Sequence, residues 1–450
     1  MKFSHIIVIG GSAAGVTAAM TARKFYQDKS IIMIKNVVNV PIPCGIPYIF
    51  GTIDSVDKNA LPTNKMMTAN HIDVLECEVA SIDPKRKVLT TTSGQDLGYE
   101  KLILANGSLP IIPPIKGIDL KHVYPIVKNL DHLRKMLEEI KPLKSFVIIG
   151  GGFIGVEMAE EIKKMNPEAH VTIVEMQDHC LQLVYDEDLS ALAEQALLDQ
   201  GIKLETKETV VEFVGHGDVE GVVLKSGRTI KADCVILGIG ATPNTKLAKE
   251  AGLKLGPARG IEVDRYMQTS EEDIFACGDV ADKISFFDGK PSSLRLASIA
   301  TTEGRIAGFN TYKLQREFKG AIGVFSTYIG HKVFAAAGLT VRDAIAKGYQ
   351  IVSADSEAVN RHPGCMPNAE NLKVRLVFDK QTQILIGGQV YGAVTGGEFI
   401  NVIAALIASK AKAEDIVLFQ AGTHPALTAS PVAYQLVTAA ESALIQFNQL

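Results

Sequence analysis

The chain has 450 residues, more than one hydrophobic core usually supports, so two or three domains are expected. Its formal net charge of −4 gives no electrostatic reason to expect nucleic acid or a membrane surface as a partner. No apolar run reaches the roughly eighteen residues that span a bilayer. The six cysteines have no paired spacing, which argues against a zinc site or a disulfide framework and favours the reducing cytoplasm.

The first predicted unit is a strand, a glycine turn and a helix. Residues 6–9 are continuously apolar, as in a strand buried on both faces, and residues 16–25 have the composition of a helix. In the turn between them, Gly10 permits the sharp bend and Gly15 permits close packing of helix on strand. The N–H groups at the start of the helix are suited to a pyrophosphate.

This first turn departs from the dinucleotide-binding pattern in two places. Ser12 stands at the middle glycine, and Ile34 or Lys35 stands where the second strand, residues 31–35, usually ends in a carboxylate that binds the adenosine ribose. Taken alone, the motif fits a structural turn about as well as a cofactor site.

A single cysteine, Cys44, follows this unit, where a flavin would lie. A Cys-x-x-x-x-Cys redox pair would need a second thiol at position 49, which is Ile49. The pattern therefore predicts one thiol working with a flavin, with the second sulfur supplied from elsewhere. Residues 45–47 suit the start of a helix, whose dipole would lower the pKa of the thiol by at most about one and a half units.

The second glycine turn fits the dinucleotide fingerprint closely. The apolar strand at residues 146–149 leads into Gly150-Gly151-Gly152-Phe153-Ile154-Gly155, and a helix is predicted from Val156. The next strand, residues 171–174, closes on Glu175, twenty residues after Gly155. A carboxylate there accepts hydrogen bonds from a ribose 2′-hydroxyl and repels a 2′-phosphate, so NADH is predicted over NADPH.

Two later patterns complete the chain. Asp279 follows a short apolar strand and a glycine, a position from which it can bind the ribityl hydroxyls of a flavin. Residues 372–378 and 384–390 form a hairpin signature, which breaks the earlier αβ rhythm and indicates a different C-terminal domain.

Together these residues resemble the pyridine nucleotide–disulfide oxidoreductases. The resemblance is to their single-cysteine branch of coenzyme A-disulfide reductases, NADH oxidases, NADH peroxidases and persulfide or sulfur reductases. Asn106 stands where the family usually has Thr. The resemblance covers essentially the whole chain, and the matching pieces are Gly10 to Gly15, Cys44 to Tyr48, Ala105-Asn106-Gly107, Gly150 to Gly155 with Glu175, residues 238–244, and Gly278-Asp279.

The resemblance implies an α/β fold with two Rossmann-like dinucleotide-binding domains, for FAD and NAD, and a C-terminal α+β dimerisation domain. The FAD domain would comprise residues 1–112 and 243–318, the NAD domain residues 113–242, and the dimerisation domain residues 321–450. A homodimer is implied. The implied cofactor-binding residues are Gly10, Ser12, Ala13, Ala14, Gly15, Lys35, Cys44, Ala105, Asn106, Gly107, Gly150, Gly152, Phe153, Ile154, Gly155, Glu175, Gly240, Asp279 and Ala297.

The family branches differ at Ala13, where peroxidases and many oxidases carry a His that polarises peroxide. Alanine offers neither proton nor charge, so disulfide or persulfide reduction is favoured. The resemblance also places Cys365 near a tyrosine that the partner subunit brings to the reactive thiol. His424, next to Pro425, is similar to the His that protonates a leaving thiolate in two-cysteine relatives.

The predicted function is FAD-dependent reduction of a disulfide, persulfide or polysulfide by NADH, with Cys44, Cys365 and His424 as catalytic residues. An NADH oxidase is the nearest alternative, and a redox-sensing or electron-transfer flavoprotein is an alternative of another class. An anionic substrate such as a coenzyme A derivative would find cationic side chains in Arg23, Lys24, Arg361 and His362.

Overall fold

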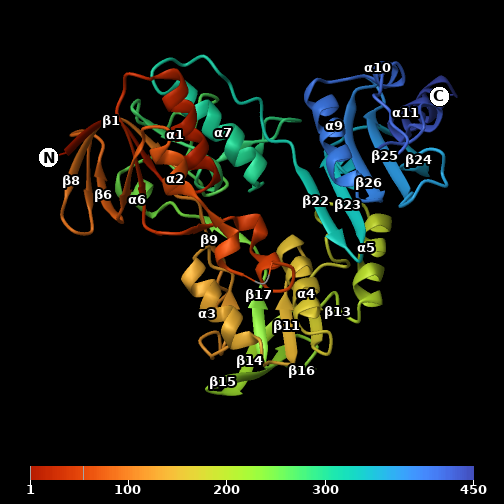
Figure 1. Ribbon diagram of the computed structural model, residues 1–450, viewed down its shortest axis with the longest axis horizontal. Coiled ribbons are helices and arrows are strands. Elements are labelled where there is room, and N and C mark those ends of the chain that lie inside the picture. Colours follow the sequence, from red (N-terminus) through yellow and green to blue (C-terminus); the bar gives the residue numbers. More distant parts are fainter. Residues whose placement is uncertain (1, 54, 450) are drawn as a thin grey trace. The chain divides into compact units, whose positions relative to one another are not determined.

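The structure is a computed structural model that describes residues 2–53 and 55–449 (Figure 1). The chain divides into two compact units, each assembled from segments distant in the sequence. The first unit comprises Met1–Pro114, Tyr124–Pro142 and Ile239–Ala321. The second comprises Ile115–Val123, Leu143–Gly238 and Ile322–Leu450. The three-domain boundaries stay a prediction.

The first unit is built on a sheet with the strand order β5-β2-β1-β8-β7-β6, in which β19 also pairs with β8. Strands β5, β2, β1, β8 and β19 are parallel, whereas β6 and β7 are antiparallel to their neighbours. The principal elements are β1 (Lys2–Ile9), α1 (Ala13–Phe25), β2 (Ile31–Lys35), β5 (Asp73–Glu76), β6 (Val79–Asp83), β7 (Val88–Thr91), β8 (Asp96–Leu104), β19 (Ile274–Ala276) and α7 (Ala297–Asn310). Shorter elements are β3 (Val40–Pro41), η1 (Pro43–Gly45), η2 (Pro47–Ile49), η3 (Asp57–Asn59), β4 (Ala60–Leu61), α2 (Thr63–Thr68), β9 (Ser108–Pro110), α3 (Leu130–Ile140), β18 (Ala241–Pro243), α6 (Lys246–Glu250), η4 (Gly278–Val280), β20 (Lys283–Ile284) and β21 (Pro291–Ser292).

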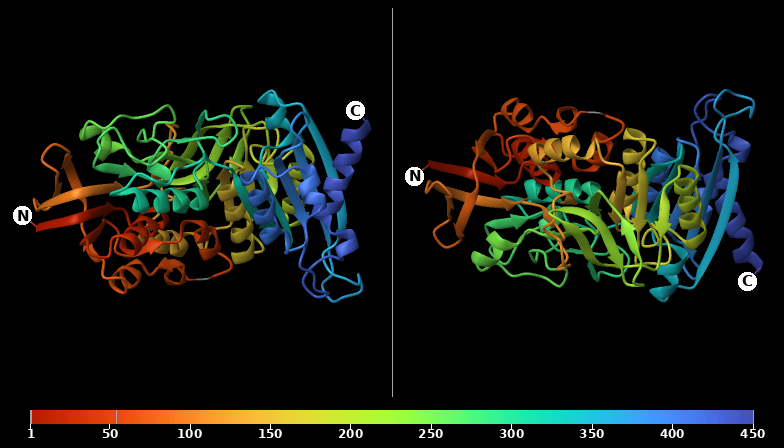
Figure 2. Two further views of the ribbon diagram at one scale, coloured as in Figure 1. Left: turned by 90° about the horizontal axis from the view of Figure 1, so that it is seen from above. Right: turned by 90° about the horizontal axis from the view of Figure 1, so that it is seen from below.

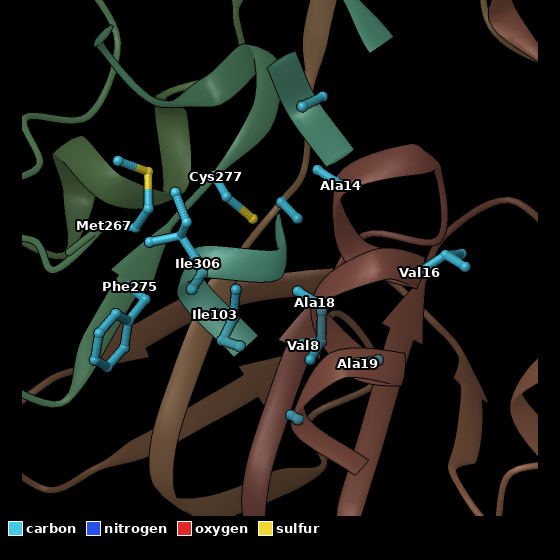
Figure 3. Close-up of a cluster of buried hydrophobic side chains, with 14 of the residues drawn as sticks. Val8, Ala14, Val16, Ala18, Ala19, Ile103, Met267, Phe275, Cys277 and Ile306 are labelled. Carbon is cyan, nitrogen blue, oxygen red and sulfur yellow. The ribbon is translucent and has the colours of Figure 1, made fainter. Parts of the chain in front are cut away.

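Small residues let α1 and α7 pack closely over this sheet. A Cβ added to Gly304 of α7 would lie 2.5 Å from the Ala14 carbonyl oxygen, and one added to Gly308 would lie 2.4 Å from that of Ala18. The same helices line a buried apolar cluster that includes Ala18 and Ile306 (Figure 3). The alanine content of α1 is therefore explained by contact with a second helix as well as by helix propensity.

Both helices that follow glycine turns begin three residues earlier than predicted. α1 begins at Ala13, and α4 (Phe153–Met165) begins at Phe153. The last residues of each glycine turn are therefore the first turn of the helix, which brings its N–H groups to the end of the preceding strand.

The second unit combines a parallel sheet with a C-terminal antiparallel sheet. Strands β17, β11, β12 and β13 pair in that order and are parallel, and β14, β15 and β16 form a small antiparallel sheet. These elements are β11 (Ser145–Ile149), β12 (His170–Val174), α5 (Glu187–Asp199), β13 (Lys203–Glu205), β14 (Val210–His216), β15 (Asp218–Leu224), β16 (Thr229–Lys231) and β17 (Cys234–Leu237); β10 (Val123–Pro125) begins in this unit. Among the described residues, none of the helices combines the length and the apolar character that a membrane crossing requires.

The C-terminal sheet has the order β22-β23-β26-β25-β24 and is antiparallel throughout. The predicted hairpin is confirmed as β25 and β26. The last helix, α11, packs against β24 and β25 (Figure 2). The elements are β22 (Val324–Ile329), β23 (Lys332–Gly338), α8 (Val341–Ala346), β24 (Ile351–Val359), β25 (Asn371–Asp379), β26 (Leu385–Gly392), α9 (Gly396–Ala408), α10 (Ala413–Val417), η5 (Pro431–Ala433) and α11 (Gln435–Gln449).

Candidate active site

The first glycine turn has the geometry of a pyrophosphate site. Gly10 has a φ of +121°, and a Cβ there would lie 2.2 Å from the Ala105 carbonyl oxygen. A Cβ on Gly15 would lie 2.0 Å from the Gly10 oxygen, so both glycines are required by backbone contact. The Ser12 side chain makes no capping hydrogen bond with the described residues, and the first turn of α1 has no acidic side chain. The N–H groups of this turn, which includes Ala13 and Ala14, therefore suit an anion.

Lys35, at the end of β2, lies beneath this turn. A Cβ on Gly11 would lie 2.9 Å from the Lys35 Cδ, and the Lys35 side chain is only 2% exposed. Its Nζ donates to the carbonyl oxygens of Val37 and Val38 and to Glu76 Oε1, the last at 2.9 Å. An ammonium has three protons, so this one has no donor left for a cofactor.

Cys44 is exposed on η1. The predicted helix start after it is wrong, because residues 43–49 form two three-residue 3₁₀ helices, each with a proline at its start. Such short helices have only a small dipole, so little lowering of the thiol pKa is expected from that source.

Asn59 holds the backbone around this cysteine. Its side-chain amide donates to the Ile42 carbonyl oxygen at 3.0 Å, and the Ile42 N–H donates to the Asn59 oxygen at 2.9 Å. A Cβ on Gly45 would lie 2.1 Å from Asn59 Oδ1. Asn59 is 2% exposed, and the sequence pattern gave no sign of it because it belongs to a separate segment fifteen residues later.

Residues 105–107 are tied to the chain segment that begins the second half of this unit. The Asn106 amide donates to the Asn244 carbonyl oxygen at 2.7 Å, and the Asn244 N–H donates to the Gly107 oxygen at 3.0 Å. Asn106 thus has a structural use at the position where Thr is usual. Gly240, with a φ of +96°, lies in the same segment as Asn244, which begins at Ile239.

Asp279 lies close to the first turn. A Cβ on Gly278, whose φ is +78°, would lie 2.7 Å from the Ala14 Cβ. Asp279 Oδ2 accepts hydrogen bonds from the Ser108 hydroxyl at 2.7 Å and from Lys128 Nζ at 3.2 Å. Burial alone would raise the pKa of Asp279, but Lys128 and the Ser108 hydrogen bond lower it, so the group is a carboxylate suited to accept from hydroxyls.

A buried ion pair supports the Asp279 turn. Glu303 of α7 is fully buried, and its Oε2 accepts from the Gly278 N–H at 2.7 Å. Lys283 Nζ lies 3.5 Å from Glu303 Oε1 and donates to the Gly278 carbonyl oxygen. Burial raises the pKa of Glu303 to about 7, although Lys283 opposes this shift. Ala297, the first residue of the same helix, is exposed.

The second glycine turn repeats this geometry with one informative addition. A Cβ on Gly155 would lie 1.8 Å from the Gly150 carbonyl oxygen, so these two residues are again in backbone contact. Gly152 has an ordinary φ of −77°, and a Cβ there would meet no atom of the described residues within 4 Å. No neighbour among the described residues requires glycine at 152, whereas a dinucleotide lying against the backbone would.

Glu175 is fixed beside this turn. Its Oε2 accepts from the Gly151 N–H at 2.6 Å, and its Oε1 accepts from the Gln177 N–H at 2.7 Å. Each carboxylate oxygen keeps a lone pair for a ribose hydroxyl. In the same turn Ile154 is 40% exposed, whereas the Phe153 ring stacks on Phe325 with centroids 5.4 Å apart.

Glu157 is a functional-site candidate that sequence reasoning missed. It lies in the first turns of α4, and its Oε1 accepts from the Thr327 hydroxyl of β22 at 2.9 Å. Burial raises the pKa of Glu157 to about 7, and Glu160 and Glu161 add to the effect. The signal available in the sequence was a carboxylate among the small and apolar residues that follow the turn.

The structure brings the loops of Cys365 and His424 together within the second unit, and both residues are exposed. The His362 N–H donates to the Pro425 carbonyl oxygen at 3.1 Å, and His362 Nδ1 lies 3.0 Å from the Thr428 oxygen. His424 Nδ1 accepts from the Ala426 N–H at 3.2 Å. In neutral His424 the proton is therefore on Nε2, which can donate it outward.

Two of the cations considered for an anionic substrate have backbone partners instead. Arg23 donates to the carbonyl oxygens of Tyr26, Gln27, Lys29 and His71, and Arg361 donates to that of Pro367. Both guanidinium groups therefore stabilise backbone segments of this chain.

Comparison with known proteins defines the class. Residues 4–304 match the model of the pyridine nucleotide-disulphide oxidoreductases, and residues 324–433 match that of their dimerisation domain. A protein of Methanocaldococcus jannaschii named NADH oxidase is 31% identical over 448 residues, covering 97% of this chain and 98% of the relative. The NAD(P)H coenzyme A polysulfide/persulfide reductase of Pyrococcus horikoshii is 31% identical over 395 residues, covering 86% and 87%.

A solved structure agrees with these relatives. The NAD-dependent persulfide reductase from A. fulgidus superimposes with a TM-score of 0.91 at 28% identity, covering 99% of this chain and 84% of that one. The fold and the two turns define a flavoprotein that carries two dinucleotides. The chain belongs to the pyridine nucleotide-disulphide oxidoreductase family, and it is an FAD- and NADH-dependent oxidoreductase with a dimerisation domain.

Proposed function

We propose that this enzyme uses NADH to reduce a disulfide, persulfide or polysulfide through Cys44. The observation that carries the proposal is the exposed Cys44, held by the Asn59 contacts in the same unit as the first glycine turn. Ala13 supports a sulfur acceptor, because a methyl group cannot polarise a peroxide. The relatives named as persulfide or polysulfide reductases support it too.

The two cofactors and the sulfur substrate would each be bound by different residues. The turn from Gly150 to Gly155 binds the NADH pyrophosphate, and Glu175 accepts hydrogen bonds from the ribose hydroxyls. The first turn and Asp279 hold FAD, which when bound supplies the two-electron transfer between NADH and sulfur. Cys44 is the nucleophile, as a thiolate.

The sulfur step is a thiol–disulfide exchange. The Cys44 thiolate attacks one sulfur of the substrate, forms a mixed disulfide and expels the other sulfur as a thiolate. His424 of the partner subunit would give the leaving thiolate its Nε2 proton. Two electrons and a proton then return the mixed disulfide to the Cys44 thiolate and a free thiol. Cys365 of the partner subunit would be the second sulfur if the enzyme resolves the mixed disulfide internally.

Cys44→Ser tests the proposal directly. The variant should bind FAD and accept electrons from NADH as the parent does, but turnover of coenzyme A disulfide or polysulfide should fall at least about 1,000-fold, because serine is not ionised near neutrality. Stopped-flow flavin absorbance and steady-state NADH consumption separate the two half-reactions. Cys77→Ser, a cysteine of the same unit, is the matched control. Parent-like sulfur turnover by Cys44→Ser would refute the proposal.

The relatives named NADH oxidase favour oxygen as a second candidate acceptor. Oxygen reduction to peroxide needs no thiol, so aerobic NADH consumption without a sulfur substrate distinguishes the candidates. Under the oxidase hypothesis it persists in Cys44→Ser at a rate comparable to the parent's best sulfur turnover. Under the sulfur hypothesis it is slow in both proteins.

A further inference from the structure

The adenosine end of the first nucleotide site lacks its expected carboxylate. Of the two candidates at the end of β2, Ile34 is apolar and buried, and Lys35 has no acceptor atom. The vicinal hydroxyls of the adenosine ribose in FAD would find no partner on this strand. FAD is nevertheless the cofactor of the family to which the chain belongs.

A carboxylate stands one strand away. β2 and β5 are parallel and in register, with Lys35 opposite Glu76 at their carboxyl ends. Glu76 Oε1 accepts hydrogen bonds from Lys35 Nζ at 2.9 Å and from the Asn64 amide at 2.7 Å. Within residues 2–53 and 55–449 no hydrogen bond to Glu76 Oε2 is made, and the side chain is 38% exposed.

The surroundings keep this carboxylate ionised and fixed. The Asn64 hydrogen bond and then the Lys35 hydrogen bond lower the pKa of Glu76. The Lys35 stem also lies against Gly11, which places the Lys35–Glu76 pair beside the pyrophosphate turn. In a dinucleotide fold the ribose lies between that turn and the end of the second strand. Glu76 therefore has charge, rigidity and a vacant acceptor at the place where the ribose needs one.

We propose that Glu76 replaces the usual second-strand acid and accepts hydrogen bonds from the adenosine ribose of FAD through Oε2. Lys35 and Asn64 are positioning residues that hold Oε1. The carboxylate thus comes from β5 instead of β2, and the cation at the end of β2 holds it in place. The assignment depends on FAD as the cofactor and not on the sulfur substrate or on Cys44.

Glu76→Gln is the decisive variant, because glutamine keeps an oxygen for Lys35 and Asn64 but replaces Oε2 with an uncharged donor. FAD and FMN are titrated separately into the full chain stripped of flavin, and binding is followed by flavin fluorescence. FMN lacks the adenosine half. The Kd for FAD should rise about 10- to 100-fold, as expected for lost hydrogen bonds to a charged group, while the Kd for FMN stays unchanged. Glu138→Gln, an equal charge change on the exposed face of α3, should alter neither.

Asn64→Ala is a milder second variant, because it removes one of the two donors to Oε1. It should raise the Kd for FAD roughly 2- to 5-fold, again without effect on FMN. Thermal unfolding of the stripped proteins checks that each variant folds. An unchanged FAD affinity in Glu76→Gln, or equal losses for FAD and FMN, would overturn the assignment. If Glu76→Gln does not fold, Asn64→Ala decides by the same comparison. None of these results depends on sulfur turnover, so they leave the proposed function to its own test.

Discussion

The two glycine turns meet the same backbone requirement but differ in which strand supplies the nearby carboxylate. In both, the last glycine is in contact with the carbonyl oxygen of the first. A Cβ on Gly15 would lie 2.0 Å from the Gly10 oxygen, and one on Gly155 would lie 1.8 Å from the Gly150 oxygen. In the second unit the acid follows its own strand, as Glu175, and bonds to the Gly151 N–H. In the first unit the corresponding strand ends in Lys35, and the nearby carboxylate comes from the neighbouring strand, as Glu76.

The difference separates what the fold imposes from what the ligand requires. Backbone contact between helix and strand leaves no room for a Cβ, so the positions of the glycines are determined within one short turn of the sequence. A ribose requires only an acceptor at a point in space. A parallel sheet brings two strand ends to the same edge, so either strand can supply that acceptor.

The strongest test of the comparison is to obstruct the two glycine turns separately, by substituting the last glycine of each. A Cβ at Gly15 or Gly155 would lie 2.0 or 1.8 Å from a backbone oxygen, and relief requires the helix to move. Gly155→Ala should weaken NADH binding about 100-fold while the flavin is retained, since overpacking against a backbone oxygen lies at the upper end of the range of about 1–3 kcal/mol. Gly15→Ala should give protein without flavin.

Flavin content after purification and the NADH dependence of flavin reduction measure the two effects. Each variant is the control for the other. Loss of flavin in Gly155→Ala, or full flavin content in Gly15→Ala, would contradict the assignment of the two turns to different dinucleotides.

The next largest effect should come from the carboxylate of the second turn. Glu175→Ala removes the acceptor that we propose for the NADH ribose and the charge that would repel a 2′-phosphate. The kcat/KM for NADH should fall about 10- to 100-fold and that for NADPH should rise or stay level, which narrows the ratio between them. Glu205→Ala, an acid that pairs with Arg228 at the neighbouring strand end, is a suitable control. An unchanged cofactor ratio in Glu175→Ala would count against its contact with the ribose.

The features predicted from the sequence and those missed differ in the same physical way. Gly10, Gly150 and Glu175 were recognised because a turn and its strand end are local in sequence. Asn59, which holds the Cys44 loop, and Glu76, which pairs with Lys35, were not recognised because their meaning depends on which distant segments lie side by side.

The helix after Cys44 was predicted wrongly for a related reason. Pro47 at a helix start is a favourable local signal, but a second proline at position 43 and the contact of Gly45 with Asn59 accompany two short 3₁₀ turns there instead. The C-terminal hairpin was recognised because alternation and a turn are again local patterns.

The smallest expected effect concerns Glu157, a half-buried acid near the second turn. The folded pKa of Glu157 is about 7, above its ordinary value of 4.5, so folding favours the protonated carboxyl. Below pH 4.5 the group is protonated folded or unfolded and carries no penalty. As pH rises from 4.5 to 7 the unfolded chain loses the proton first, and the free energy of unfolding falls by about 1–2 kcal/mol, a figure reduced for partial exposure.

Glu157→Gln keeps an acceptor for the Thr327 hydroxyl but does not ionise, so its stability advantage over the parent should grow between pH 5 and pH 7.5 and then level off. Denaturant unfolding at several pH values measures it, and an advantage that is constant or shrinks with pH would show that Glu157 ionises freely in the folded protein.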